Sequence, residues 1–287
     1  MVSPLQFEIP TALQYFAALV AEDGGLSVLE AAAAVAQDEY PQLDTQDVLA
    51  QIDVLADRLR RRIPADAAPM QRMLLVNQFF FHELRFAGNV NDYFDARNSY
   101  LCDVLKTRHG IPITLALIYI EIATQAGLPA TGVSFPGHFL VKLSMPRGEV
   151  VIDPFTGHSL SREELDERLT PFRRQRGQVG EFEAPLGLFL QAAPPREVIA
   201  RLLRNLKEIH RAGADWSRLL CVQERLVVLL PQAWEEHRDR GLARAELGHF
   251  RLAQQDLLMY LQHRPDAADA VALRRRLAEL RCGPTLQ

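Results

Sequence analysis

The sequence contains few cysteines and no long apolar run. Its three cysteines, Cys102, Cys221 and Cys282, are widely spaced and form no Cys-x-x-Cys pair. This usage argues against a disulfide framework and predicts small buried thiols in a reduced, cytoplasmic protein. No apolar run approaches the roughly 20 residues of a membrane helix, and no basic segment followed by an apolar stretch opens the chain. We therefore expect neither a membrane span nor a secretory signal.

The chain also lacks the usual signals for nucleic acids, nucleotides and metals. Its net charge is −4, and the basic clusters at 58–62, 173–176 and 274–276 mostly lie among acidic residues and helix formers. They are expected to be solvated helix faces rather than nucleic-acid contacts. Gly24-Gly25 has neither a preceding strand nor a following Lys-Ser/Thr, so no phosphate loop is predicted. The histidines form no His-x-x-x-His pair, and neither a metal site nor a cofactor is expected.

The first part of the chain has the periodicity of helices. Thr11 and Ser27 are suitable caps for helices over 12–21 and 28–37. Apolar residues then recur at helical spacing over 48–59, and a further helix is predicted over 70–86. Residues 1–66 are accordingly interpreted as an N-terminal helical segment.

The middle of the chain predicts a small sheet packed on a buried helix. Residues 113–126 are apolar nearly all the way round, as expected of a helix without a solvent face. Gly127 and Pro129 end this helix. Three short β-rich runs follow, separated by Pro-Gly and Pro-Arg-Gly turns, at 133–135, 138–143 and 150–152. The predicted fold class is α+β, mostly helical, with an antiparallel sheet on that helix.

The C-terminal part is helical and contains an internal repeat of 34 residues. Aromatic, aliphatic and proline residues recur at this period: Trp216 and Phe250, Leu219 and Ala253, Pro231 and Pro265. The spacing resembles that of the tetratricopeptide repeat (TPR), in which pairs of helices stack and present a groove to peptides or partner helices. A plain helical bundle is the alternative. The TPR interpretation implies a protein or peptide partner.

Two residues of the middle part could form a catalytic pair. His138 is expected at the start of one strand and Asp153 at the end of its neighbour, where the two would face each other. A cysteine hydrolase or transferase uses such a histidine, held by a carboxylate, to activate a thiol. The thiol should come from the first turn of the buried helix, where the sequence reads Ile111-Pro112-Ile113.

Several motifs together resemble a known family of bacterial transglutaminase-like proteins with C-terminal TPR units, named for an association with an invasion-gene regulator (Sir-type). The motifs are FAGNVNDYFDARNSYL (86–101), RHGIPITLALIY (108–119), AGLP (126–129), GHFLVK (137–142) and IDPF (152–155). The resemblance spans about residues 40–265. It implies a transglutaminase-like, papain-like core over 67–180 and a TPR-like domain over 181–287. It also implies that His138 and Asp153 are the second and third members of a triad whose cysteine position is Pro112.

Proline has no nucleophilic atom, so the sequence predicts a non-catalytic binding or regulatory protein. Thr114, two residues further along the helix, should point away and bond to backbone. The alternative is an active amide hydrolase or acyl transferase in which Cys102, or a water activated by His138, replaces the missing thiol. Cys102 is more simply a buried apolar filler.

The Asn-rich segment 89–98 has two interpretations. Asn and Asp hydrogen-bond to their own backbone, so the segment could simply build consecutive turns. Alternatively, Asn89, Asn91, Asn98 and Arg108 could border the cleft beside the catalytic pair and bind a polar peptide or an amide side chain. In either case Arg108 is expected to form an ion pair with an aspartate of this segment.

Overall fold

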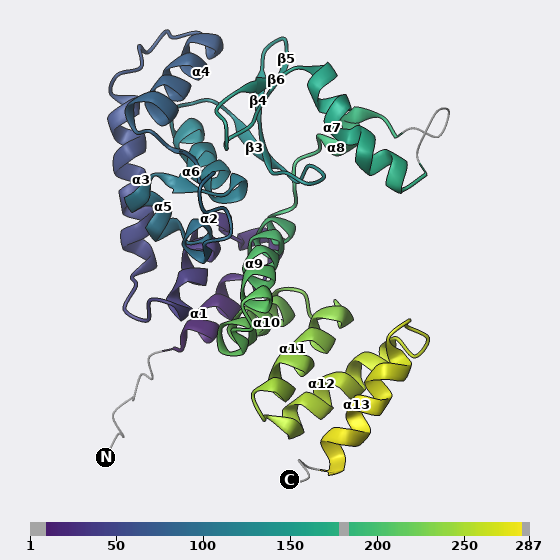
Figure 1. Ribbon diagram of the computed structural model, residues 1–287. Helices are drawn as coiled ribbons and strands as arrows, with labels where there is room; N and C mark the ends of the chain where they lie inside the picture. Colours follow the sequence, from purple (N-terminus) through teal and green to yellow (C-terminus); the bar gives the residue numbers. More distant parts are fainter. Residues whose placement is uncertain (1–9, 178–183, 283–287) are drawn as a thin grey trace, which may run out of the picture. The chain divides into compact units, whose positions relative to one another are not determined.

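A computed structural model describes residues 10–177 and 184–282, with helices and strands drawn in Figure 1. The chain divides into two compact units. The core unit comprises residues 27–36 and 42–202, and the repeat unit comprises 1–26, 37–41 and 203–287. This division joins the N-terminal helix to the C-terminal helices. The domain boundaries at 66 and 180 inferred from the sequence remain predictions.

The core unit is built around the buried helix α6 (Pro112–Gln125). This helix packs against α3 (Thr45–Arg60) and against the strands β3 (Ala130–Val133) and β4 (Leu140–Met145) (Figure 1). The other helices of this unit are α2 (Val28–Ala34), α4 (Pro69–Asn77), α5 (Leu101–Thr107), α7 (Arg162–Gln175) and α8 (Leu186–Phe189). Because α6 is surrounded on several sides, nearly all of its residues are apolar, as its sequence predicted.

Four antiparallel strands form the sheet of the core unit in the order β3-β4-β5-β6, where β5 is Gly148–Ile152 and β6 is Ser159–Leu160. Val141 pairs with Ile152, so the start of β4 and the end of β5 lie at the same end of the hairpin. Apolar residues of the sheet pack with Leu165 and Leu169 of α7. Two short parallel strands, β1 (Ala87–Gly88) and β2 (His109–Gly110), form a second ladder just before α6.

The repeat unit is helical. It contains α1 (Ala12–Leu19), α10 (Trp216–Leu229), α11 (Trp234–Glu246), α12 (Phe250–His263) and α13 (Ala270–Cys282), while α9 (Pro195–Ala212) begins in the core unit. The 34-residue repeat of the sequence is visible in the structure, because Trp216 and Phe250 each begin a helix. Gly241 lets α11 and α12 approach closely: a Cβ at this position would lie 3.0 Å from the Asp256 Cβ. The antiparallel α11–α12 pair thus has the small-residue contact that TPR packing requires.

Several local predictions were wrong. The helix expected over 70–86 changes to π-helical geometry over Gln78–Glu83 and ends before Gly88. Asn98 and Ser99 lie in a 3₁₀ turn capped by Asp95, ahead of α5. His138 does not open a strand, since β4 begins two residues later. In the described parts of the chain, no helix combines the length and the apolar character needed to span a bilayer.

Candidate functional site

His138 and Asp153 form a hydrogen-bonded pair at the open end of the β4–β5 hairpin. His138 lies in the turn before β4 and Asp153 directly follows β5, and the register of this hairpin brings the two residues together. The Nε2 atom of His138 is 2.8 Å from Oδ1 of Asp153. Nδ1 has no hydrogen bond with the residues that the structure describes, so one ring nitrogen is held and the other is left for a reacting group. This is the arrangement of a base oriented by an acid.

Asp153 is buried, with 2% of its side chain exposed, and its carboxylate has several donors. The backbone N–H of Phe155 donates to Oδ1 at 3.0 Å, and Arg168 donates to Oδ2 at 3.2 Å. Burial alone would raise the pKa of Asp153. The hydrogen bond and charge of His138, together with these two donors, outweigh burial and lower the pKa to about 2. Asp153 therefore remains ionised and fixes His138.

Backbone hydrogen bonds connect the start of α6 to the Asp153 loop. Gly88 of β1 pairs with Gly110 of β2, two residues before Pro112. The N–H of Gly88 also donates to the carbonyl of Phe155 at 2.9 Å. A Cβ on Gly88 would lie 2.3 Å from the Phe155 ring, so only glycine fits there. The strand that leads into α6 is thus tied to the loop that contains Asp153.

Pro112 occupies the first position of α6 and Thr114 its third. Proline is well suited to a first helical position because its missing N–H has no partner there in any case. Thr114 is fully buried: its hydroxyl donates to the Asn98 carbonyl at 2.8 Å and accepts from the Ile111 N–H at 3.2 Å. The hydroxyl of Thr114 is therefore engaged with backbone, as the sequence predicted, and is not available as a nucleophile.

Cys102 lies in the first turn of α5 and is 4% exposed. Burial, reinforced by the negative charge of Asp103, raises the pKa of this thiol to about 11. His138 is not among the groups that perturb Cys102, and no hydrogen bond joins the two side chains. A thiol with a raised pKa is a poor nucleophile at neutral pH.

The Asn-rich segment is built by its own side chains. Asn89 donates to the Asn98 side-chain oxygen at 3.0 Å and accepts from the Asp92 N–H at 3.1 Å. Asn98 is buried and donates to the Asp92 carbonyl at 2.7 Å. These bonds favour the turn-building interpretation for Asn89 and Asn98. Asn91 is exposed and could still contact a ligand.

Arg108 lies elsewhere than the sequence suggested. It forms no salt bridge in the described part of the chain, and Asp95 pairs with Arg97 instead. The guanidinium of Arg108 stacks on the Phe86 ring, 4.8 Å from its centroid. It lines a pocket whose other residues come from α3 and α5 rather than from the loops of His138 and Asp153. The expected ion pair was therefore wrong, and a role for Arg108 beside His138 remains a prediction.

Sequence reasoning missed three neighbours of the pair. Arg168 on α7 reaches Asp153, although nothing in its own sequence context distinguishes it from other helix-surface arginines. Phe155 packs edge-on to His138, with ring centroids 6.4 Å apart, and Tyr93 lies 5.9 Å from Phe155. Phe155 belongs to the motif IDPF and lies two residues after Asp153, and this closeness in the sequence could have indicated that Phe155 is a neighbour of the pair. Across the described residues, no group of three His, Cys, Asp or Glu side chains converges as metal ligands would.

Comparisons with known proteins agree with this architecture. The model of the transglutaminase-like superfamily matches residues 46–204, and that of the tetratricopeptide repeat matches 206–278. A UPF0162 protein of Xylella fastidiosa is 39% identical over 90% of this chain and 92% of its own length. A UPF0162 protein of Pseudomonas aeruginosa is 28% identical over 88% of this chain and 91% of its own. Mouse F-box only protein 21 is 32% identical over 50% of this chain but only 22% of its own length.

No solved structure matches the chain significantly. The two family models confirm the α+β, transglutaminase-like class and the TPR module predicted from the sequence. The names of these relatives do not support the association with an invasion-gene regulator (Sir-type).

Proposed function

The chain belongs to the UPF0162 family, with a transglutaminase-like core and a TPR module, and we propose that it is a non-catalytic, partner-binding protein. In this proposal the core keeps the base and the acid of a transglutaminase-like triad without its nucleophile. The TPR module binds a protein or peptide and gives the chain a regulatory role. The proposed site of action is the cytoplasm, because Cys102 and Cys221 are free thiols.

The observation that carries the proposal is the content of the first turn of α6. The residues just before this turn are tied through Gly88 to the Asp153 loop, yet the turn offers a pyrrolidine ring at Pro112 and a fully engaged hydroxyl at Thr114. Acyl transfer from a glutamine side chain needs an atom that attacks the amide carbon. His138 and Asp153 can orient and accept a proton, but they provide no such atom in the arrangement of a triad.

The alternative of a displaced nucleophile has less support. Cys102 is buried, its pKa is raised and it does not contact His138. A water activated by His138 would give hydrolysis rather than transfer, and would need the free Nδ1 atom as base. Amide hydrolysis that depends on His138 but not on Cys102 would identify that mechanism.

The TPR part of the proposal is supported by the geometry of the repeat unit. Helices α11 and α12 pack closely through Gly241, and α13 follows as a closing helix. Stacked helix pairs of this kind present a groove to extended peptides or to a partner helix.

The test is to incubate the purified protein with a glutamine-containing peptide and a labelled primary amine, and to measure amine incorporation and ammonia release. The matched variants are His138→Ala and Cys102→Ser. We expect no turnover above the protein-free reaction for any of the three proteins. Turnover by the wild type that His138→Ala abolishes would overturn the proposal, and the effect of Cys102→Ser would then separate a thiol mechanism from activated water.

A further inference from the structure

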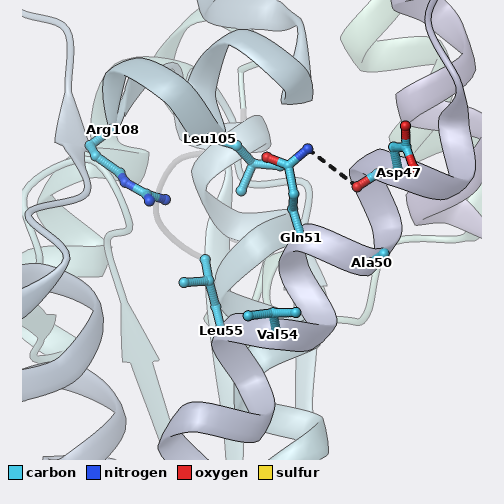
Figure 2. A pocket seen from close by; sticks show the side chains of 7 residues that line it. All are labelled: Asp47, Ala50, Gln51, Val54, Leu55, Leu105 and Arg108. Carbon is cyan, nitrogen blue, oxygen red and sulfur yellow. Dashed lines mark hydrogen bonds between the residues drawn. The ribbon is translucent and has the colours of Figure 1, made fainter.

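A pocket of about 450 Å³ lies on the core unit between α3 and the end of α5, and neither His138 nor Asp153 is among its lining residues (Figure 2). Its floor is formed by the buried Leu55 and Leu105. Arg108 points its guanidinium toward the pocket from one side, and Asp47 lies at the opposite side (Figure 2). The pocket therefore has a cationic end and an apolar floor.

The cationic end is unpaired. Nη1 of Arg108 is buried and has no hydrogen-bond partner among the described residues. A buried charged donor without a partner costs more than an ordinary lost hydrogen bond, and an incoming carboxylate would remove that cost. Arg58, one turn beyond Val54 on α3, lies over the Phe79 ring, forms no ion pair with the described residues, and adds its positive charge near Arg108. Burial and the charge of Arg58 both lower the pKa of Arg108.

Arg108 is also held in place. It ends α5 with φ 63° and ψ 11°, the left-handed conformation that usually requires glycine or asparagine at a helix end. An arginine here carries a conformational cost, as residues at ligand sites often do. Its stacking on Phe86 fixes the guanidinium further. The side chain is thus preorganised, so little rotamer freedom is lost when it binds a carboxylate.

The wall along α3 is open to solvent. Val54 is 63% exposed, and Ala50 and Gln51 are exposed as well. An enclosed cavity would suit a small molecule, whereas an open groove along a helix suits a chain segment lying across it. We propose that this pocket is a docking site for a short peptide segment of a partner protein that presents a carboxylate to Arg108 and an adjacent aliphatic side chain to Leu55 and Leu105. This site is independent of the TPR module.

The experiment uses the full chain and an array of acetylated, amidated hexapeptides. Each peptide has leucine, valine or isoleucine beside one variable position that is glutamate, aspartate, glutamine, asparagine or lysine. We expect the acidic peptides to bind about tenfold more tightly than their amide counterparts, the effect of one charge-assisted hydrogen bond. Arg108→Gln should remove this preference. Arg147→Gln, which removes the same charge from an exposed turn, should leave it unchanged.

A pair of substitutions at one exposed position tests the electrostatic part of the proposal. Val54→Glu and Val54→Lys both remove the same apolar side chain, but they place opposite charges in the pocket. Val54→Glu should weaken binding of the acidic peptides more than Val54→Lys does. Equal binding of glutamate and glutamine peptides would overturn the proposal. Binding of butyrate or inorganic phosphate to Arg108 without any peptide binding would overturn it too, because the pocket would then be a small-anion site.

Discussion

At the scale of single residues, the proposed function depends on the residue at position 112. A histidine with one nitrogen held by a buried carboxylate is chemically ready to accept a proton, and the structure provides this in His138 and Asp153. The first turn of α6 nevertheless contains Pro112, which is well suited to the start of a helix but has no nucleophilic atom. The pair could be foreseen from the sequence because hairpin register brings the ends of neighbouring strands together. The contact of Arg168 with Asp153 could not be foreseen, because it depends on how α7 packs on the sheet.

The ionisation of Asp153 predicts a pH-dependent contribution to stability. Folding lowers its pKa from 3.8 to about 2, so the folded state is stabilised above about pH 4 and this contribution is lost as the pH falls toward 2. The shift corresponds to roughly 2 kcal/mol. Denaturant unfolding of wild type and Asp153→Asn should show a difference in unfolding free energy that shrinks by about this amount between pH 6 and pH 2. A difference that stays constant with pH would contradict the assignment.

Cys102 should resist alkylation in the folded protein. Its thiol is 4% exposed and its pKa is raised to about 11, so the reactive thiolate is scarce near neutral pH. Iodoacetamide at pH 7, followed by peptide mapping, should leave Cys102 unmodified until denaturant is added. Rapid modification of Cys102 in the native protein, slowed by His138→Ala, would instead support the displaced-nucleophile mechanism.

At the scale of elements, the sequence predicted those whose formation depends on local pattern. The nearly continuous apolar character of α6, with Gly127 at its end, was sufficient to predict a buried helix. Thr11 also caps α1 as the sequence predicts, with its hydroxyl accepting from the Gln14 N–H at 3.2 Å. The π-helical segment after α4 was not predictable, because side-chain periodicity does not reveal a change in backbone hydrogen bonding. His138 was placed in a strand because β propensity does not locate the last residue of a turn.

The contact between α11 and α12 depends on Gly241. A Cβ here would lie 3.0 Å from side-chain atoms of Asp256 and Leu257, and Asp256 is itself held by Arg240 and Arg244. Gly241→Val should therefore destabilise the repeat unit by about 1 to 3 kcal/mol through overpacking. Thermal unfolding followed by circular dichroism measures the effect. Gly24→Val, with nothing within 4 Å of the added Cβ, is the control, and equal effects would contradict this packing.

At the scale of the whole molecule, the repeat unit combines segments from opposite ends of the chain. Arg225 of α10 has 1% of its side chain exposed and donates to both carboxylate oxygens of Asp38, at 2.7 and 2.8 Å. It also donates to the Ala12 carbonyl at 3.3 Å and stacks over the Phe16 ring. Because Arg225 lies far from Asp38 and Ala12 in the sequence, no local sequence pattern indicates these contacts. For this reason the contacts that join α1 to the C-terminal helices were not predictable from the sequence.

The Arg225–Asp38 pair should be strongly coupled. Removing one partner of a largely buried pair leaves an uncompensated charge, so Arg225→Ala should cost about 3 kcal/mol. A double-mutant cycle with Asp38→Ala, measured by denaturant unfolding, separates the pair from the other contacts of Arg225. We expect a coupling energy above about 1 kcal/mol. Additive effects of the two substitutions would show that the pair contributes little.

The most direct test of the account is to restore the missing thiol with Pro112→Cys and to measure its alkylation rate against pH, with peptide mapping to separate it from the native cysteines. If position 112 faces the free nitrogen of His138 at the start of a helix, the new thiol should titrate below the ordinary value of about 8.5. Adding His138→Ala should then slow its alkylation at pH 7 about tenfold. A thiol that stays as unreactive as Cys102, or that reacts equally with and without His138, would contradict the claim that this protein is a triad lacking only its nucleophile.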